Sequence, residues 1–150
     1  MMIWEDKRII VDTNILIYAN YADAIFKEQA RNKLHWLSQN KYKMWISRQI
    51  MREFLVYATR YNFENDKIES KTLVDNIFHN FQQYTIANTN DMVSANLKDL
   101  IEKHNLSGKK IHDANIVATM QAYNITKLLT HNVKDFERFN DVIEIVPLIE

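Results

Sequence analysis

The sequence predicts an α/β fold in which helices cover both faces of a short parallel β-sheet. Five apolar or β-branched segments of four or five residues alternate with longer segments of helical period along the 150 residues. A strand–helix–strand order favours parallel strands, because the chain must cross back over the sheet between them. No internal repeat, linker or change of composition divides the chain, so we expect one domain over residues 1–150.

The first half of the chain predicts two strands and a set of helices. Residues 8–12 are apolar on both faces and read as a buried strand, followed by one or two helical turns over residues 14–19. Asp23 is the expected cap of the next helix, and residues 43–47 form the second strand. The helix that Asp23 is expected to cap has an apolar stripe formed by Phe26, Ala30, Leu34 and Leu37.

Ser47 is the expected cap of a helix after the second strand. Its stripe is Ile50, Phe54, Tyr57 and Ala58. A further helix is expected over residues 65–81, with the stripe Val74, Ile77, Phe78 and Phe81. The second half predicts helices over residues 91–104 and 110–123 and strands over residues 84–87, 127–130 and 142–146.

The composition excludes several classes of protein. The chain has no Cys, which excludes a disulfide framework, a thiolate zinc site and a cysteine nucleophile. Its one glycine cannot build a Walker A loop or a dinucleotide-binding fingerprint. The first eight residues include two acids rather than the basic start of a signal peptide, and no apolar run approaches the ~20 residues that cross a bilayer. We expect a soluble, cytoplasmic protein without a membrane partner.

Four carboxylates lie at positions where the local sequence pattern predicts other residue types. Asp12 ends the first strand, and the carboxyl ends of parallel strands line the crevice in which such sheets bind ligands. Glu53 and Asp113 each fall on the apolar stripe of their helix, and Asp135 follows the strand over residues 127–130. An unpaired buried carboxylate costs several kcal/mol, so each of these groups needs a partner or must be protonated.

A divalent metal ion is the partner that the residue types favour. Carboxylate oxygens without Cys or paired His suit a hard ion such as Mg²⁺ or Mn²⁺. The five histidines are scattered and show no zinc-binding spacing.

Each acid also has a structural interpretation. Asp12 can simply end its strand, and Glu53 can pair with Arg48, Arg52 or Arg60. Asp113 can cap a helix that begins at Ala114. Asn132 can cap a turn over residues 133–139, with Asp135 reaching back to complete a capping box.

Two other enzyme classes that place an Asp after a strand do not fit. A haloacid-dehalogenase-like phosphatase needs a second Asp two residues later, where this chain has Asn14. A receiver domain needs acidic neighbours before the first strand's Asp, where this chain has Ile10 and Val11.

Four segments together resemble the four motifs of PIN domains, with the VapC-type toxins of toxin–antitoxin pairs as the nearest branch. They are, in order along the chain, Val11-Asp12-Thr13-Asn14-Ile15-Leu16, Arg52-Glu53-Phe54, Ile111-His112-Asp113-Ala114-Asn115-Ile116-Val117-Ala118-Thr119 and Leu129-Thr130-His131-Asn132-Val133-Lys134-Asp135-Phe136. The resemblance implies a PIN-like α/β/α sandwich and a ribonuclease that uses Mg²⁺ or Mn²⁺ to leave a 5′-phosphate and a 3′-hydroxyl. It also implies a homodimer and an antitoxin partner.

Carried over by position, the resemblance implies that Asp12, Glu53 and Asp113 hold the metal. Asp135 is the expected fourth acid and Asn132 a polar helper. Thr13 and Thr130 match hydroxyl positions that orient water or phosphate.

Arg48, Arg52, Lys109 and Lys110 are candidate contacts to an RNA backbone, although a solvated helical face is the better explanation of each pair taken alone. The alternatives to a toxin are a nuclease of RNA processing and a catalytically silent PIN-like module that binds RNA or protein.

Overall fold

A five-stranded parallel sheet forms the centre of the protein. The computed structural model describes residues 5–21 and 24–149. Its strands are β1 (Arg8–Val11), β2 (Lys43–Ser47), β3 (Thr85–Ala87), β4 (Lys127–Thr130) and β5 (Glu144–Pro147). They lie in the order β3-β2-β1-β4-β5, and every neighbouring pair is parallel. The predicted α/β class and parallel sheet are therefore confirmed.

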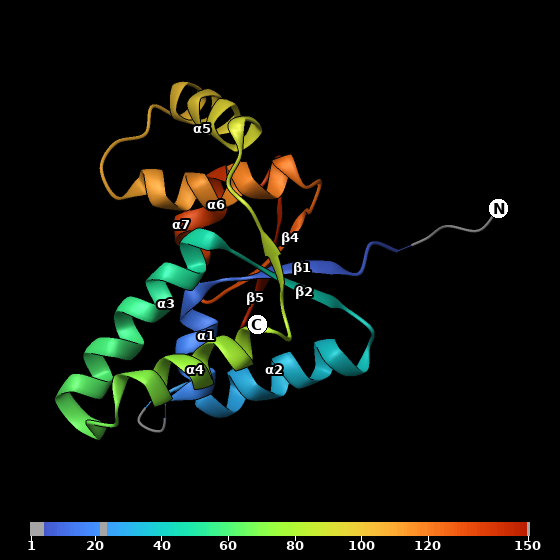
Figure 1. Cartoon of the computed structure of the whole chain (residues 1–150). Coiled ribbons are helices and arrows are strands. Elements are labelled where there is room, and N and C mark those ends of the chain that lie inside the picture. Colours follow the sequence, from blue (N-terminus) through green and yellow to red (C-terminus); the bar gives the residue numbers. More distant parts are fainter. Residues whose placement is uncertain (1–4, 22–23, 150) are drawn as a thin grey trace.

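Helices lie on both sides of this sheet. They are α1 (Thr13–Asn20), α2 (Lys27–Gln39), α3 (Arg48–Tyr61), α4 (Ser70–Phe81), α5 (Asp91–His104), α6 (Lys110–Ala122) and the short α7 (Val133–Phe136). Figure 1 shows α5 and α6 together on one side of the strands, with α1, α2 and α4 on the other. The middle strand β1 is almost fully enclosed, with Ile9, Ile10 and Val11 at most 1% exposed. This burial explains why its sequence is apolar on both faces.

Most predicted elements are confirmed within a residue or two. The helix over residues 91–104 and the strand over residues 127–130 have the predicted bounds. The Ser47 side chain caps α3 by accepting a hydrogen bond from the Ile50 backbone N–H at 3.1 Å. The predicted cap Asp23 lies outside the described residues.

The predicted start of the helix over residues 65–81 is wrong. α3 runs on into a π-helical turn, Asn62–Asp66, which ends where Lys67 adopts a left-handed conformation with φ of 51°. The buried Asn62 side chain fixes this turn, because its amide bonds both the N–H and the carbonyl of Ile68 at 3.0 Å. α4 therefore begins only at Ser70, and Phe78 of the expected stripe is 45% exposed.

Two strand ends also differ from the prediction. The strand predicted over residues 142–146 begins at Glu144, because Val142 and Ile143 donate to the Phe139 carbonyl in the turn after a 3₁₀ segment, Glu137–Phe139. The first strand ends at Val11 rather than at Asp12, which is the N-cap of α1. Among the described residues, no helix is long and apolar enough to cross a bilayer.

Candidate active site

The four acids come from four helix starts around the carboxyl edge of the sheet. Asp12 caps α1 directly after β1, and Glu53 lies in the second turn of α3, which follows β2. Asp113 lies in the first turn of α6, and Asp135 lies in α7 after β4. The acids act on one another electrostatically, because the charges of Asp135, Asp12 and Glu53 all raise the pKa of Asp113.

Asp12 is the most buried of the four, and both of its carboxylate oxygens accept hydrogen bonds. It is 6% exposed. One carboxylate oxygen, Oδ1, accepts from the Thr13 backbone N–H at 2.8 Å, and Oδ2 accepts from the Thr130 hydroxyl at 2.8 Å. Burial raises the pKa of Asp12 to about 6 against these hydrogen bonds, with smaller contributions from the charges of Glu53 and Asp135. Among the described residues, no Lys, Arg or His forms a salt bridge with this buried carboxylate.

Glu53 belongs to a second hydrogen-bond network that joins three helices. Its Oε2 accepts from the Thr13 hydroxyl at 2.8 Å, and its Oε1 accepts from the Gln49 amide at 2.7 Å. The same Gln49 amide donates to the His112 carbonyl at 3.0 Å, and Gln49 Oε1 accepts from the Asn115 amide at 2.7 Å. Thr13 thus bonds Asp12 through its backbone and Glu53 through its hydroxyl, which fixes the two acids relative to each other.

Asp113 and Asp135 are held less tightly. Within residues 5–21 and 24–149, neither carboxylate accepts a hydrogen bond or forms a salt bridge. Asp113 is half-buried, and its pKa is raised to about 6, first by desolvation and then by the neighbouring acids. Asp135 is exposed on α7, beside a shallow cavity lined by residues 131–135.

The structure contradicts the structural interpretations of three of these acids. Asp113 is no N-cap, since α6 begins three residues earlier at Lys110. No capping box forms at α7, because the Asn132 side chain caps nothing and the Asn132 backbone N–H donates to the Thr130 hydroxyl at 3.0 Å. Glu53 bonds Thr13 and Gln49 instead of an arginine.

Sequence reasoning missed three amide side chains that hold the acids. Asn14 donates to Asp12 Oδ2 at 3.4 Å and to the Thr130 hydroxyl at 3.3 Å, and it accepts from the His131 backbone N–H at 3.2 Å. Gln49 and Asn115 complete the Glu53 network. The available signal was spacing, because Asn14 and Asn115 each lie two residues after a candidate acid and Gln49 lies one helical turn before Glu53.

The four predicted basic residues are all exposed. Arg48 is tied to Asn88 by two hydrogen bonds to the amide oxygen, at 2.9 and 3.0 Å. In the part of the chain that the structure describes, Arg52, Lys109 and Lys110 form no salt bridge.

The acids suit a hard divalent ion in their chemistry but do not form a finished metal site. They offer only oxygen donors, and two of them carry raised pKa values that a cation would relieve. In the described ranges, however, no three Asp, Glu or His side chains lie in an arrangement that could hold a metal ion. Both carboxylate oxygens of Asp12 and of Glu53 accept hydrogen bonds, whereas those of Asp113 and Asp135 accept none among the described residues.

Thr130 is the residue on which the position of Asp12 depends most. Its hydroxyl is fully buried, donates to Asp12 and accepts from Asn14 and from the Asn132 backbone. Thr130→Val keeps the shape but leaves the Asn132 N–H without its acceptor and Asp12 Oδ2 with only the 3.4 Å bond from Asn14, so we expect a loss of roughly 1–3 kcal/mol in the free energy of unfolding.

Urea unfolding measures this effect of Thr130→Val. Thr126→Val, at an exposed threonine just before β4, is the matched control and should cost much less. Equal losses for the two variants would contradict a special role for the Thr130 hydroxyl.

The fold and its acids define the class of this protein: it is an α/β protein with four carboxylates at the carboxyl edge of a parallel sheet. The sequence matches the family model of the PIN domain over residues 9–142. The chain therefore belongs to the PIN domain family, as its four motifs predicted. No curated protein matches the sequence significantly.

Solved structures with the same fold include toxins of toxin–antitoxin complexes. The VapBC-1 structure of nontypeable Haemophilus influenzae matches with a TM-score of 0.68 at 19% identity, covering 95% of this chain and 99% of that chain. A toxin–antitoxin complex from Klebsiella pneumoniae matches with a TM-score of 0.64 at 23% identity, covering 94% and 98%. VapC20 of Mycobacterium tuberculosis, described as a toxin that cleaves the sarcin–ricin loop, matches with a TM-score of 0.57 at 16% identity, covering 80% and 86%.

Proposed function

We propose that this protein is a divalent-metal-dependent endoribonuclease that acts as the toxin of a VapBC-type toxin–antitoxin pair. The observation that carries the proposal is the cluster of four mutually repelling carboxylates, none of which has a salt bridge within the described residues. A cluster of this kind costs folding stability, and that cost is explained if the acids serve to bind a cation.

Asp12, Glu53 and Asp113 are the proposed ligands of Mg²⁺ or Mn²⁺, with Asp135 as the fourth acid and Asn132 beside it. A bound ion would polarise the scissile phosphate and lower the pKa of the attacking water. The chain itself supplies no side-chain nucleophile to this reaction, so the acids position the water and the ion. Cleavage is expected to leave a 5′-phosphate and a 3′-hydroxyl.

The surrounding residues hold this arrangement and receive the substrate. Thr13 and Thr130 are positioning residues, since each bonds a proposed ligand at 2.8 Å. Arg52, Lys109 and Lys110 are exposed cations near Glu53 and Asp113 in sequence and are proposed to contact RNA phosphates. Arg48 would do so only by giving up its bonds to Asn88.

An RNA cleavage assay tests the proposed activity. Purified protein is incubated with a panel of structured RNAs in Mn²⁺, in Mg²⁺ and in EDTA. We expect cleavage with either metal and none in EDTA, because the acids need the ion to activate water. Cleavage that persists undiminished in EDTA would contradict a metal-dependent mechanism.

Thermal unfolding gives a second readout of the metal that does not depend on cleavage. Because the ion relieves carboxylate repulsion, Mn²⁺ should stabilise the fold by a few kcal/mol at saturating concentrations. An unchanged melting temperature at high Mn²⁺ would count against the site. It would favour the second candidate function, a catalytically silent binding module, which agrees with the lack of a ready set of three metal ligands in the described chain.

The proposed partners are a second copy of the chain and an antitoxin. The similar structures include toxin–antitoxin complexes, and this chain exposes several large apolar side chains: Trp36 on α2, Val56 on α3, Phe63 in the π turn after α3 and Phe78 on α4. Light scattering at micromolar concentrations should therefore report a dimer. A monomer at every concentration would contradict the dimer.

A further inference from the structure

A cavity of about 210 Å³ opens between α1, α3 and α4, away from the four acids. Its wall is made of Leu16, Phe54, Ile77 and Phe81, all of which are buried. A dry cavity of about 150 Å³ already accepts a benzene ring, so this space suits one planar ring system rather than a folded segment.

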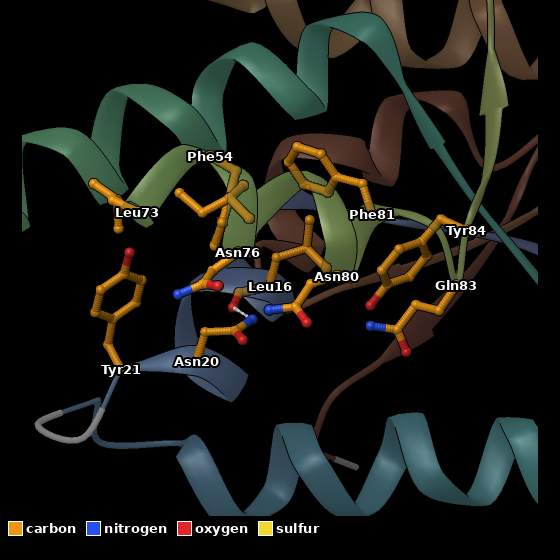
Figure 2. A pocket seen from close by; sticks show the side chains of 11 residues that line it. Leu16, Asn20, Tyr21, Phe54, Leu73, Asn76, Asn80, Phe81, Gln83 and Tyr84 are labelled. Atoms are coloured by element: carbon orange, nitrogen blue, oxygen red, sulfur yellow. Dashed lines mark hydrogen bonds between the residues drawn. The ribbon is translucent and has the colours of Figure 1, made fainter. Parts of the chain in front are cut away.

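The mouth of the cavity is lined by carboxamides. Asn20, Asn76, Asn80 and Gln83 come from α1, from α4 and from the turn before β3, and all four side chains are exposed. Figure 2 shows the amides of Asn20, Asn76 and Asn80 gathered between Tyr21 on one side and Tyr84 on the other.

These amides are mostly free to bind a ligand. Among the residues that the structure describes, the side-chain amides of Asn76, Asn80 and Gln83 make no hydrogen bond, whereas the Asn20 amide donates to the Leu16 carbonyl at 2.7 Å. No Lys, Arg, Asp or Glu is among the lining residues. The cavity therefore offers hydrogen-bond donors and acceptors but no charge, which argues against a phosphate or a carboxylate as its ligand.

Two phenol rings flank the same opening. Tyr84 is 8% exposed, and burial raises its pKa to about 12, so its hydroxyl stays neutral. The Tyr21 ring is packed against Tyr57 and Tyr61, with ring centroids 5.1 and 4.7 Å apart. Aromatic faces beside unpaired carboxamides are the groups that proteins use to stack a base and to read its edges.

Although none of the four acids lines the cavity, two of its lining residues lie close along their helices to proposed active-site residues. Leu16 lies one turn of α1 beyond Asp12 and Thr13, a rise of about 6 Å. Phe54 directly follows Glu53 on α3. A polynucleotide whose phosphate lies at the acids can therefore place a neighbouring base in the cavity.

We infer that this cavity binds one unpaired nucleobase of the RNA substrate and gives the enzyme a base preference next to the cleaved bond. The inference rests on the proposed ribonuclease function and assigns part of its substrate specificity. Asn80 and Gln83 would pair with the edge of the base, as Asn and Gln side chains do with adenine in nucleic-acid complexes.

RNA binding in EDTA tests the cavity without cleavage. The probes are single-stranded homopolymers of A, C, G and U about six nucleotides long. We expect one homopolymer to bind about tenfold more tightly than the others, and to shift the side-chain amide NMR signals of Asn76, Asn80 and Gln83. The double variant Asn80→Ala/Gln83→Ala should lose this preference, because a carboxamide paired with a base edge accounts for about a tenfold effect, while the two tyrosine rings that stack remain.

Gln82→Ala is the matched control, since Gln82 is an exposed neighbour that does not line the cavity. It should leave the preference unchanged. Equal binding of all four homopolymers, or a preference that survives in the double variant, overturns the inference. If the side-chain amide NMR signals shift with protein concentration but not on addition of RNA, the cavity contacts protein instead. That result would also overturn the inference.

The same measurements separate this inference from the proposed function. Metal-dependent cleavage with no base preference refutes the nucleobase site and leaves the ribonuclease proposal intact. Base-selective binding in EDTA without cleavage in Mn²⁺ or Mg²⁺ refutes the ribonuclease and supports the cavity as an RNA-binding site.

Discussion

Asp113→Asn should reduce RNA cleavage by at least about 100-fold while leaving the fold intact. Loss of a side chain that merely orients a metal ligand costs roughly 10–100-fold, and Asp113 is proposed to be a ligand itself. Its side chain makes no hydrogen bond among the described residues, so no structural contact is lost with the charge. Metal-dependent cleavage rates of the two proteins, measured side by side, check this expectation.

The stability of Asp113→Asn distinguishes a catalytic from a structural role. The substitution removes a charge that desolvation and three neighbouring acids disfavour, which stabilises the fold. It also removes an acid from the first turn of α6, which costs about 0.3–1 kcal/mol of favourable interaction with the helix dipole. We therefore expect a melting temperature in EDTA that is unchanged or slightly raised.

Asp99→Asn is a matched control for Asp113→Asn. Asp99 is exposed on the neighbouring helix α5, and its variant should cleave RNA like the wild type. If Asp113→Asn cleaves RNA at the wild-type rate, the proposed metal site would have to be assigned to other acids.

The buried carboxylate of Asp12 should make the metal-free protein less stable as the pH rises. The pKa of Asp12 is about 6 in the fold, against an ordinary value of 3.8, so the folded protein holds this proton more tightly than the unfolded chain does. Below about pH 3 both states are protonated and the group costs nothing. As the pH rises towards and past 6 the unfolded state ionises first, and the penalty grows to about 3 kcal/mol at 1.36 kcal/mol per pKa unit.

Comparison with Asp12→Asn isolates this contribution. In EDTA, the free energy of unfolding of the variant relative to the wild type should increase by roughly 2–2.5 kcal/mol between pH 4 and pH 8. The control is Asp141→Asn, because the Lys103 partner lowers the pKa of Asp141 and the pH trend of its variant should have the opposite sign. A difference between Asp12→Asn and the wild type that does not change with pH would show that Asp12 has no unusual pKa.

The strand and helix pattern was predictable because it is local. Short β-branched runs such as Ile9-Ile10-Val11 favour a strand that is buried on both faces, and the helix over residues 91–104 has its apolar stripe and its cap within or next to its own sequence. The start of α4 was not predictable in this way. It depends on the contact between Asn62 and Ile68, which adds a π turn to α3 and has no signature in the apolar period.

The sequence by itself determined the α/β order of elements, the family, and the acids that interrupt apolar stripes, because each of these features depends on residues that are close together in the sequence. Only the tertiary structure decided how those acids are held. Thr130 reaches Asp12 across 118 residues and Asn115 reaches Gln49 across 66, and no local period encodes such hydrogen bonds. The cavity at Tyr84 is likewise a product of packing, since α1, α3 and α4 each supply one side of it and none predicts the space between them.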